Sequence, residues 1–66
     1  MRVIGSFYTT QCDVAIYDTD IQIDNIKVYM IKSYHRETRK VLTRFGTKAQ
    51  IDSIVKTYRI DRRFKL

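Results

Sequence analysis

The 66-residue sequence has no proline and no tryptophan, and it contains only two glycines, one cysteine and one histidine. Because Cys12 has no second cysteine to pair with, a disulfide within the chain is excluded. A four-ligand zinc site would require Cys12 and His35 to be joined by two carboxylates, so we expect neither a metal ion nor another cofactor. Neither Gly5 nor Gly46 belongs to a glycine-rich loop of the kind that binds phosphate groups.

Long apolar segments are also missing. The N-terminal residues do not contain the apolar core of about 7–15 residues that marks a signal peptide. No apolar run approaches the ~20 residues that are needed to span a bilayer. We therefore expect a soluble, cytoplasmic protein that makes no membrane contact.

Side chains suited to catalysis are scarce. The single histidine, His35, falls in a predicted loop, and no serine or cysteine can be assigned to it as a nucleophile. Cys12 falls at an alternating strand position, which favours a small buried apolar side chain over a reactive thiol. We predict that the protein is not an enzyme.

The chain is rich in residues that favour β-structure, with nine Ile, five Val, five Tyr and seven Thr. Its length allows one small basic domain over residues 1–66. A chain this short buries only about 60% of the surface that its unfolded form exposes, so its core is thin. A monomer and a homodimer that buries spare apolar surface both remain open.

Apolar and polar residues alternate along most of the chain and predict a small antiparallel meander of about four to five short strands. Strands are expected over residues 2–10 and 12–17, and a short one remains open at residues 21–23. A basic hairpin follows, with one strand beginning at residue 26 and the return strand over residues 39–45.

Local residue chemistry predicts the irregular points of this sheet. Turn-forming aspartates occupy residues 18–20, and residues 24–25 are a turn or a bulge. Gly5 marks a bulge or a close backbone approach, and a break in the alternation predicts a bulge near residues 30–31. The loop at residues 35–38 contains no glycine, so we expect a connection of four or more residues.

The strongest local signal is a helix over residues 47–58. Thr47 and Gln50 have the spacing of a capping box, in which each side chain binds a free backbone N–H of the first turn. Apolar residues then recur at i, i+3, i+4 and i+7 and form one stripe: Ile51, Ile54, Val55 and Tyr58. Because three turns of helix are marginal alone, we expect the stripe to pack on the sheet and give an α+β fold.

Ile60, Phe64 and Leu66 alternate with polar residues, so residues 59–66 could form either a terminal strand or a tail.

The net charge of +6 is unevenly distributed along the chain. Residues 1–24 contain Arg2 against four aspartates, whereas residues 25–66 contain twelve Lys and Arg against three acidic residues. Charge that is segregated in this way indicates an interaction surface, and the alternative is that the N-terminal acids pair with the C-terminal bases across the fold.

Lys and Arg alternate with tyrosine in the basic hairpin. A hairpin face of this composition can neutralise phosphates and stack unpaired bases. We therefore predict a non-catalytic binding module whose first candidate partner is DNA or RNA. The residues expected to bind it are Lys27, Tyr29, Lys32, Tyr34, Arg36, Arg39, Lys40 and Arg44 of the hairpin and Arg59, Arg62 and Arg63 near the C-terminus.

The alternative is a small regulatory or inhibitor protein that docks on the acidic surface of a protein partner. It would act as a homodimer or by adding a strand to a partner sheet. Lys and Arg on exposed strands also discourage edge-to-edge aggregation, and tyrosine suits a half-buried sheet. Composition alone therefore does not choose between the two partners.

Overall fold

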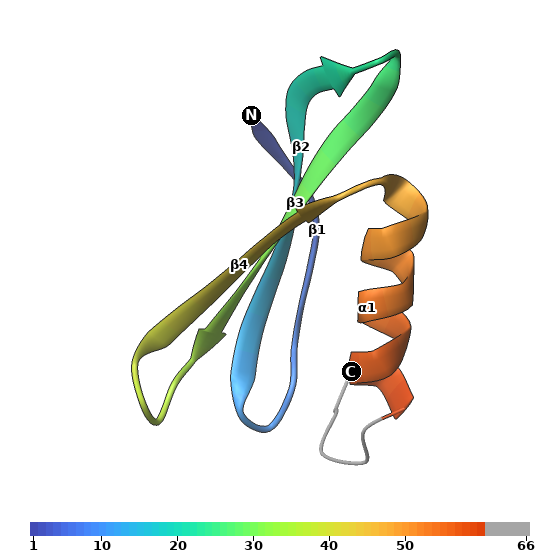
Figure 1. Ribbon diagram of the computed structural model, residues 1–66. Helices are drawn as coiled ribbons and strands as arrows, with labels where there is room; N and C mark the ends of the chain where they lie inside the picture. Colours follow the sequence, from blue (N-terminus) through green and yellow to red (C-terminus); the bar gives the residue numbers. More distant parts are fainter. Residues whose placement is uncertain (61–66) are drawn as a thin grey trace.

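Four antiparallel strands and one C-terminal helix make up the part of the chain that the structure describes, residues 1–60 with side chains through Tyr58 (Figure 1). In this computed structural model the elements are β1 (Arg2–Tyr8), β2 (Cys12–Ile23), β3 (Ile26–His35), β4 (Lys40–Gly46) and α1 (Lys48–Ile60). Each strand pairs with the next, so the sheet order is β1-β2-β3-β4. Helix α1 packs on one face of the sheet, and no described element covers the other face. The predicted α+β meander is confirmed.

Residues 18–20 do not form the predicted turn, because β2 continues through them as a bulge. The register of β2 against β3 shifts between Asp18 and Ile21. The polar side chains that favour a turn bind the bulged backbone instead. Asp18 Oδ1 accepts a hydrogen bond from the Asp20 N–H at 3.0 Å, and Thr19 Oγ1 donates to the Val28 carbonyl at 2.6 Å.

The chain reverses at residues 24–25. Asp24 and Asn25 both have left-handed backbone conformations, with φ of 51° and 64°. Two successive left-handed residues are typical of the two-residue hairpin turns that favour Asn and Asp. The β3–β4 connection, residues 36–39, has the predicted length and ends at Arg39, which is also left-handed with φ of 60°.

The predicted bulge at residues 30–31 is wrong. Strand β3 keeps a regular register there against both of its neighbours. Apolar and polar residues do not alternate clearly in the sequence here, because Met30 and Ile31 point to opposite faces and both are buried. The irregularity predicted at Gly5 is confirmed, since the β1–β2 register shifts between Val3 and Gly5.

Helix α1 begins with the predicted capping box. The Gln50 N–H donates to Thr47 Oγ1 at 3.3 Å, and the Thr47 N–H donates to Gln50 Oε1 at 2.9 Å. The apolar stripe then enters the core. Ile51 is fully buried with Cys12, Val14 and Ile31, and the partly buried Ile54, Val55 and Tyr58 pack against this cluster.

The helix continues to Ile60, two residues beyond its predicted end, so a strand at that position is excluded. The other two residues of the suggested terminal strand, Phe64 and Leu66, lie outside the described residues. Within residues 1–60, no helix is long and apolar enough to cross a membrane.

Candidate functional site

The regular alternation of β3 sorts the side chains of the sheet onto two faces. Ile31 lies in the core under α1, and Ser33 Oγ lies 2.7 Å from the Tyr58 hydroxyl of the helix. Lys32 and Tyr34, which alternate with them, therefore point to the opposite face. We call this uncovered surface the open face.

The open face is hollowed at the end where the β1–β2 and β3–β4 connections lie. The hollow has a volume of about 780 Å³. We call its open-face lining residues the aromatic half of the open face: Ser6, Tyr8, Asp13, Ala15, Tyr17, Lys32, Tyr34 and Val41. Tyr8 and Tyr34 are 58% and 39% exposed, and Lys32 Nζ lies 5.9 Å from the centroid of the half-buried Tyr17 ring.

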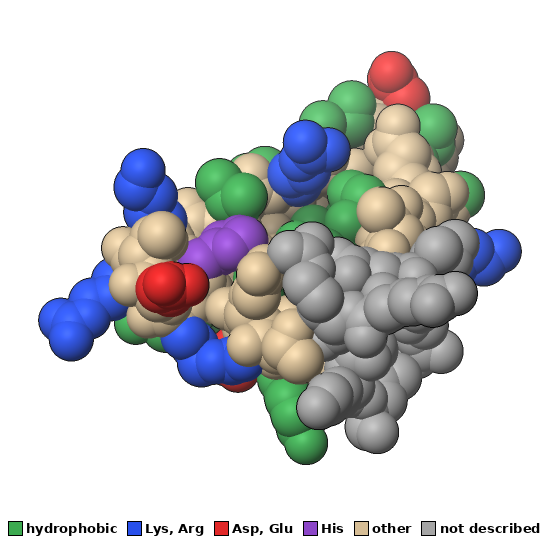
Figure 2. Space-filling model, turned by 90° about the horizontal axis from the view of Figure 1, so that it is seen from below, with side chains coloured by type: hydrophobic (Ala, Val, Ile, Leu, Met, Phe, Trp, Pro, Cys, Tyr) green, Lys and Arg blue, Asp and Glu red, His purple; other side chains and the backbone are tan. Residues whose placement is uncertain are grey.

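Two predicted cations lie at the end of the sheet where the hollow is found. Arg39 in the β3–β4 connection and Lys40 at the start of β4 are both exposed. Figure 2, seen from below, shows Lys and Arg side chains at this end of the molecule. The last pair of the sheet before the connection is His35–Lys40, so Lys40 lies on the helix side with His35. Arg39 lies in the connection, at the same end of the sheet as the hollow.

Arg36, in the same connection, is bound within the chain. Its Nη1 donates to Asp13 Oδ1 and its Nη2 donates to the Thr9 carbonyl, both at 2.6 Å. Its backbone N–H donates to the Gln11 carbonyl at 3.1 Å. Arg36 therefore ties the β3–β4 connection to the β1–β2 connection and has fewer donors left for a partner.

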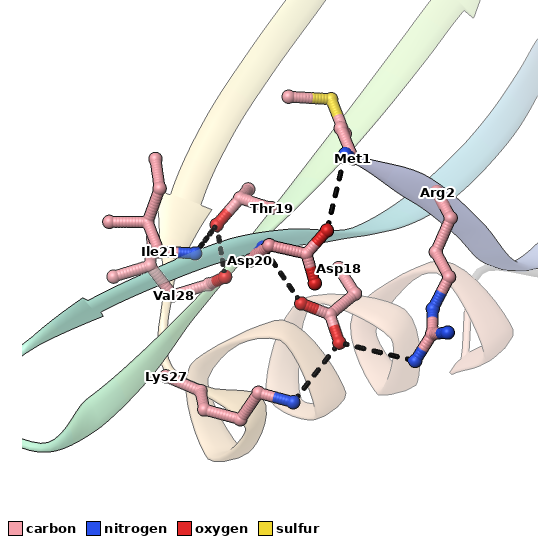
Figure 3. A network of polar contacts seen from close by, with 8 residues as sticks. All are labelled: Met1, Arg2, Asp18, Thr19, Asp20, Ile21, Lys27 and Val28. Atoms are coloured by element: carbon pink, nitrogen blue, oxygen red, sulfur yellow. Dashed lines mark hydrogen bonds and ion pairs between the residues drawn. The ribbon is translucent and has the colours of Figure 1, made fainter.

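Lys27 is engaged in a second internal network, at the bulge of β2 (Figure 3). Its Nζ lies 3.1 Å from Asp18 Oδ2, and Arg2 Nη2 lies 3.8 Å from the same oxygen. The hydrogen bond from the Asp20 N–H, followed by that from Lys27, lowers the pKa of the buried Asp18 carboxyl. The bond to Asp18 in turn raises the pKa of Lys27.

Tyr29 and Arg44 lie on the helix side of the sheet. Tyr29 packs against the core cluster, and Lys27 Nζ lies 5.9 Å from its ring centroid. Arg44 lines a groove of about 380 Å³ together with Leu42 of β4 and Ile54 of α1. Neither side chain shares a surface with Lys32.

The predicted binding residues are thus divided by the fold. Lys32 and Tyr34 lie on the open face, and Arg39 lies in the connection at the same end of the sheet. Those on the helix side or bound internally are Lys27, Tyr29, Arg36, Lys40 and Arg44. The Arg59 side chain and the residues Arg62 and Arg63 lie outside the described part of the chain.

Two tyrosines of the aromatic half, the exposed Tyr8 and the half-buried Tyr17, were not predicted from the sequence as binding residues. Tyr8 follows Phe7 and Tyr17 follows Ile16, so each stands on the face opposite a core residue. That alternation is visible in the sequence. Their convergence with Tyr34 is not, because it depends on how three strands are aligned.

The contact between Cys12 and His35 was also not predicted from the sequence. The β2–β3 register sets Cys12 opposite His35, and Cys12 Sγ lies 3.2 Å from His35 Nδ1. The sequence had suggested that His35 lies in the loop, but it is the last residue of β3. Cys12 is buried in the core cluster, as predicted. Among the described residues, no three His, Cys, Asp or Glu side chains are grouped so that they could hold a metal ion.

The chain was compared with protein-family models, with curated protein sequences and with solved structures, and none of them matches it.

Proposed function

We propose that the protein binds single-stranded nucleic acid, with little sequence preference, on the aromatic half of the open face. One observation carries the proposal. Tyr8, Tyr34 and Lys32 are exposed around a hollow on a sheet face that no described element covers. Aromatic rings held on strands are rigid platforms, because the backbone that carries them is fixed by the sheet ladder.

The chemistry of the aromatic half suits unpaired bases. Every base has a π-face, so stacking on tyrosine tolerates any sequence and contributes about 1–3 kcal/mol per base. In a duplex those base faces are already stacked on their neighbours, so the proposal favours single strands. Lys32 within the half, with the exposed Arg39 at the same end of the sheet, would neutralise the phosphates.

The small number of available cations sets the salt dependence. For single strands, the logarithm of the binding constant falls with the logarithm of salt concentration at a slope of about −0.7 per neutralised phosphate. Two cations, Lys32 and Arg39, therefore predict a slope of about −1.4. A steeper slope would require the cations on the helix side as well.

Fluorescence anisotropy with a labelled single-stranded oligonucleotide tests the proposal at low salt. We expect Tyr34→Leu, which keeps apolar bulk but removes the stacking ring, to weaken binding about tenfold. Lys32→Gln is expected to weaken binding severalfold and to reduce the salt slope. Lys48→Gln is the matched control, because Lys48 is an exposed lysine on α1, and it is expected to change binding far less than Lys32→Gln does.

Two results would reject the proposal. One is the absence of binding at low salt, and the other is an equal effect of Lys32→Gln and Lys48→Gln, which would mean unspecific attraction by net charge. If nuclease-treated protein then retained a single acidic protein partner, the alternative of a docking or inhibitor protein would replace nucleic-acid binding.

A further inference from the structure

The β2–β3 hairpin extends beyond the rest of the sheet. The pairing of β1 ends at Asp18, and that of β4 ends at Tyr29. Residues 21–28 therefore form a two-stranded ribbon without a third strand on either side, and this ribbon is visible as the projecting hairpin in Figure 1. We call it the arm. A two-stranded ribbon alone is marginally stable in water and gains stability when its apolar face is covered.

One face of the arm is aliphatic. Ile21 is paired with Val28 and Ile23 with Ile26, so all four side chains point to the same side. The three isoleucines are 51–62% exposed. Because Val28, Met30 and Lys32 lie two residues apart along the regular strand β3, they share one face, and this side of the arm is continuous with the open face.

The next layer of the open face is also apolar. Phe45, which pairs with Met30, is 63% exposed. We call this end of the surface the aliphatic half of the open face: Ile21, Ile23, Ile26, Val28 and Phe45. It carries no charged side chain, whereas Lys32 and Asp13 lie in the aromatic half.

We propose that a second copy of the chain covers the aliphatic half in a two-fold symmetric dimer. An uncharged aliphatic surface fits an apolar occupant, and a two-fold interface brings the same patch of both copies together. Two arms packed face to face would form a small sandwich, with the sheets about 10 Å apart.

The distribution of charge supports a second copy in this arrangement. Two chains that each carry a net charge of +6 repel each other. The exposed Arg39 and Lys40 lie at the end of the sheet opposite the arm, whereas the arm carries one carboxylate, Asp24, and one amine, Lys27, and so has no net charge. A two-fold axis through the aliphatic half would keep the two basic ends far apart.

The patch is small for a dimer interface. Standard interfaces bury about 800 Å² and about 20–30 residues on each partner. The five residues of the aliphatic half with the surrounding arm make a smaller contact, so we expect a weak dimer that dissociates within the micromolar range. The dimer would leave both aromatic halves exposed at its outer ends.

Sedimentation velocity from about 1 μM to about 1 mM protein tests the dimer without nucleic acid. The test variant combines Ile23→Thr with Ile26→Thr. Threonine keeps the β-branch, and both positions are exposed, so circular dichroism should show an intact fold. Val41→Thr makes the same kind of change at an exposed position in the aromatic half and serves as the matched control.

We expect the natural chain and Val41→Thr to form dimers at similar concentrations. The double variant should dimerise at least about tenfold more weakly, since two buried aliphatic side chains are lost. A monomer throughout the range would overturn the proposal, as would a double variant that dimerises like the natural chain. An equal loss in Val41→Thr would also overturn it, because the contact would then cover the whole open face.

Discussion

Arg36 is a charged side chain that the fold uses internally. Its guanidinium bridges Asp13 and the Thr9 carbonyl, and its backbone N–H reaches the Gln11 carbonyl. Nothing in the local sequence distinguishes it from Arg39, three residues later and exposed. We therefore expect a substitution of Arg36 to affect stability and a substitution of Arg39 to affect binding.

We predict that Arg36→Ala lowers the free energy of unfolding by about 1 kcal/mol, because it removes two charge-assisted hydrogen bonds at a half-exposed site. Arg39→Ala should change stability by less than about 0.5 kcal/mol but weaken nucleic-acid binding. Urea denaturation and anisotropy titration measure the two effects. Equal stability of both variants would contradict the role assigned to Arg36.

Asp18 makes stability depend on pH in the acid range. Its pKa is lowered below the ordinary value of 3.8 in the folded chain, because the Asp20 N–H and Lys27 bind the ionised carboxylate. Its contribution is therefore complete above about pH 5, where the unfolded carboxyl is also ionised, and is lost as the pH falls through the folded-state pKa.

We predict that Asp18→Asn is less stable than the natural chain at neutral pH and loses less stability on acidification. Denaturation at a series of pH values from about 5 to about 2 measures this difference. Asp20→Asn is the control, because that carboxylate is exposed and binds only the N-terminal amino group among the described residues. Parallel curves for Asp18→Asn and the natural chain would refute the prediction.

At the scale of elements, α1 was predictable because its determinants are local. The capping box and the apolar stripe each lie within a few turns, so no knowledge of the sheet is needed. Gly46 leaves room for the cap because it has no side chain: a Cβ at this position would lie 2.7 Å from Gln50 Oε1. A larger residue would displace the side chain that binds the Thr47 N–H.

We predict that Thr47→Ala destabilises the protein by about 1 kcal/mol and Gly46→Ala by about 0.5–1 kcal/mol, because each disrupts the cap. Thr57→Ala, in the middle of the helix, should be neutral or slightly stabilising, since its hydroxyl binds back to the Ser53 carbonyl. Thermal unfolding followed by circular dichroism compares the three. A Gly46→Ala variant as stable as the natural chain would show that the cap tolerates a side chain there.

The strands were less predictable than the helix. The residues from Asp18 to Asp20 favour a turn, yet the same hydrogen bonds stabilise a bulge in a strand that continues. The outcome depends on β3, whose partner residues lie about ten positions further along the chain. Asp24 and Asn25 then make the actual turn.

At the scale of the whole molecule, the two faces of the sheet determine which residues meet. The sequence identified Lys32 and Tyr34 as binding residues, but it grouped them with Tyr29 and Arg44, which lie on the helix side. Alternation along one strand shows that two residues point to opposite sides. Only the packing of α1 decides which side stays uncovered.

NMR titration of the ¹⁵N-labelled protein with a single-stranded oligonucleotide at low salt shows whether the aromatic half of the open face binds single-stranded nucleic acid. We expect the amide shifts to concentrate around Tyr8, Lys32 and Tyr34, while those of Ile54 and Thr57 on α1 stay unchanged. Shifts confined to α1, or no shifts at all, would contradict the proposal.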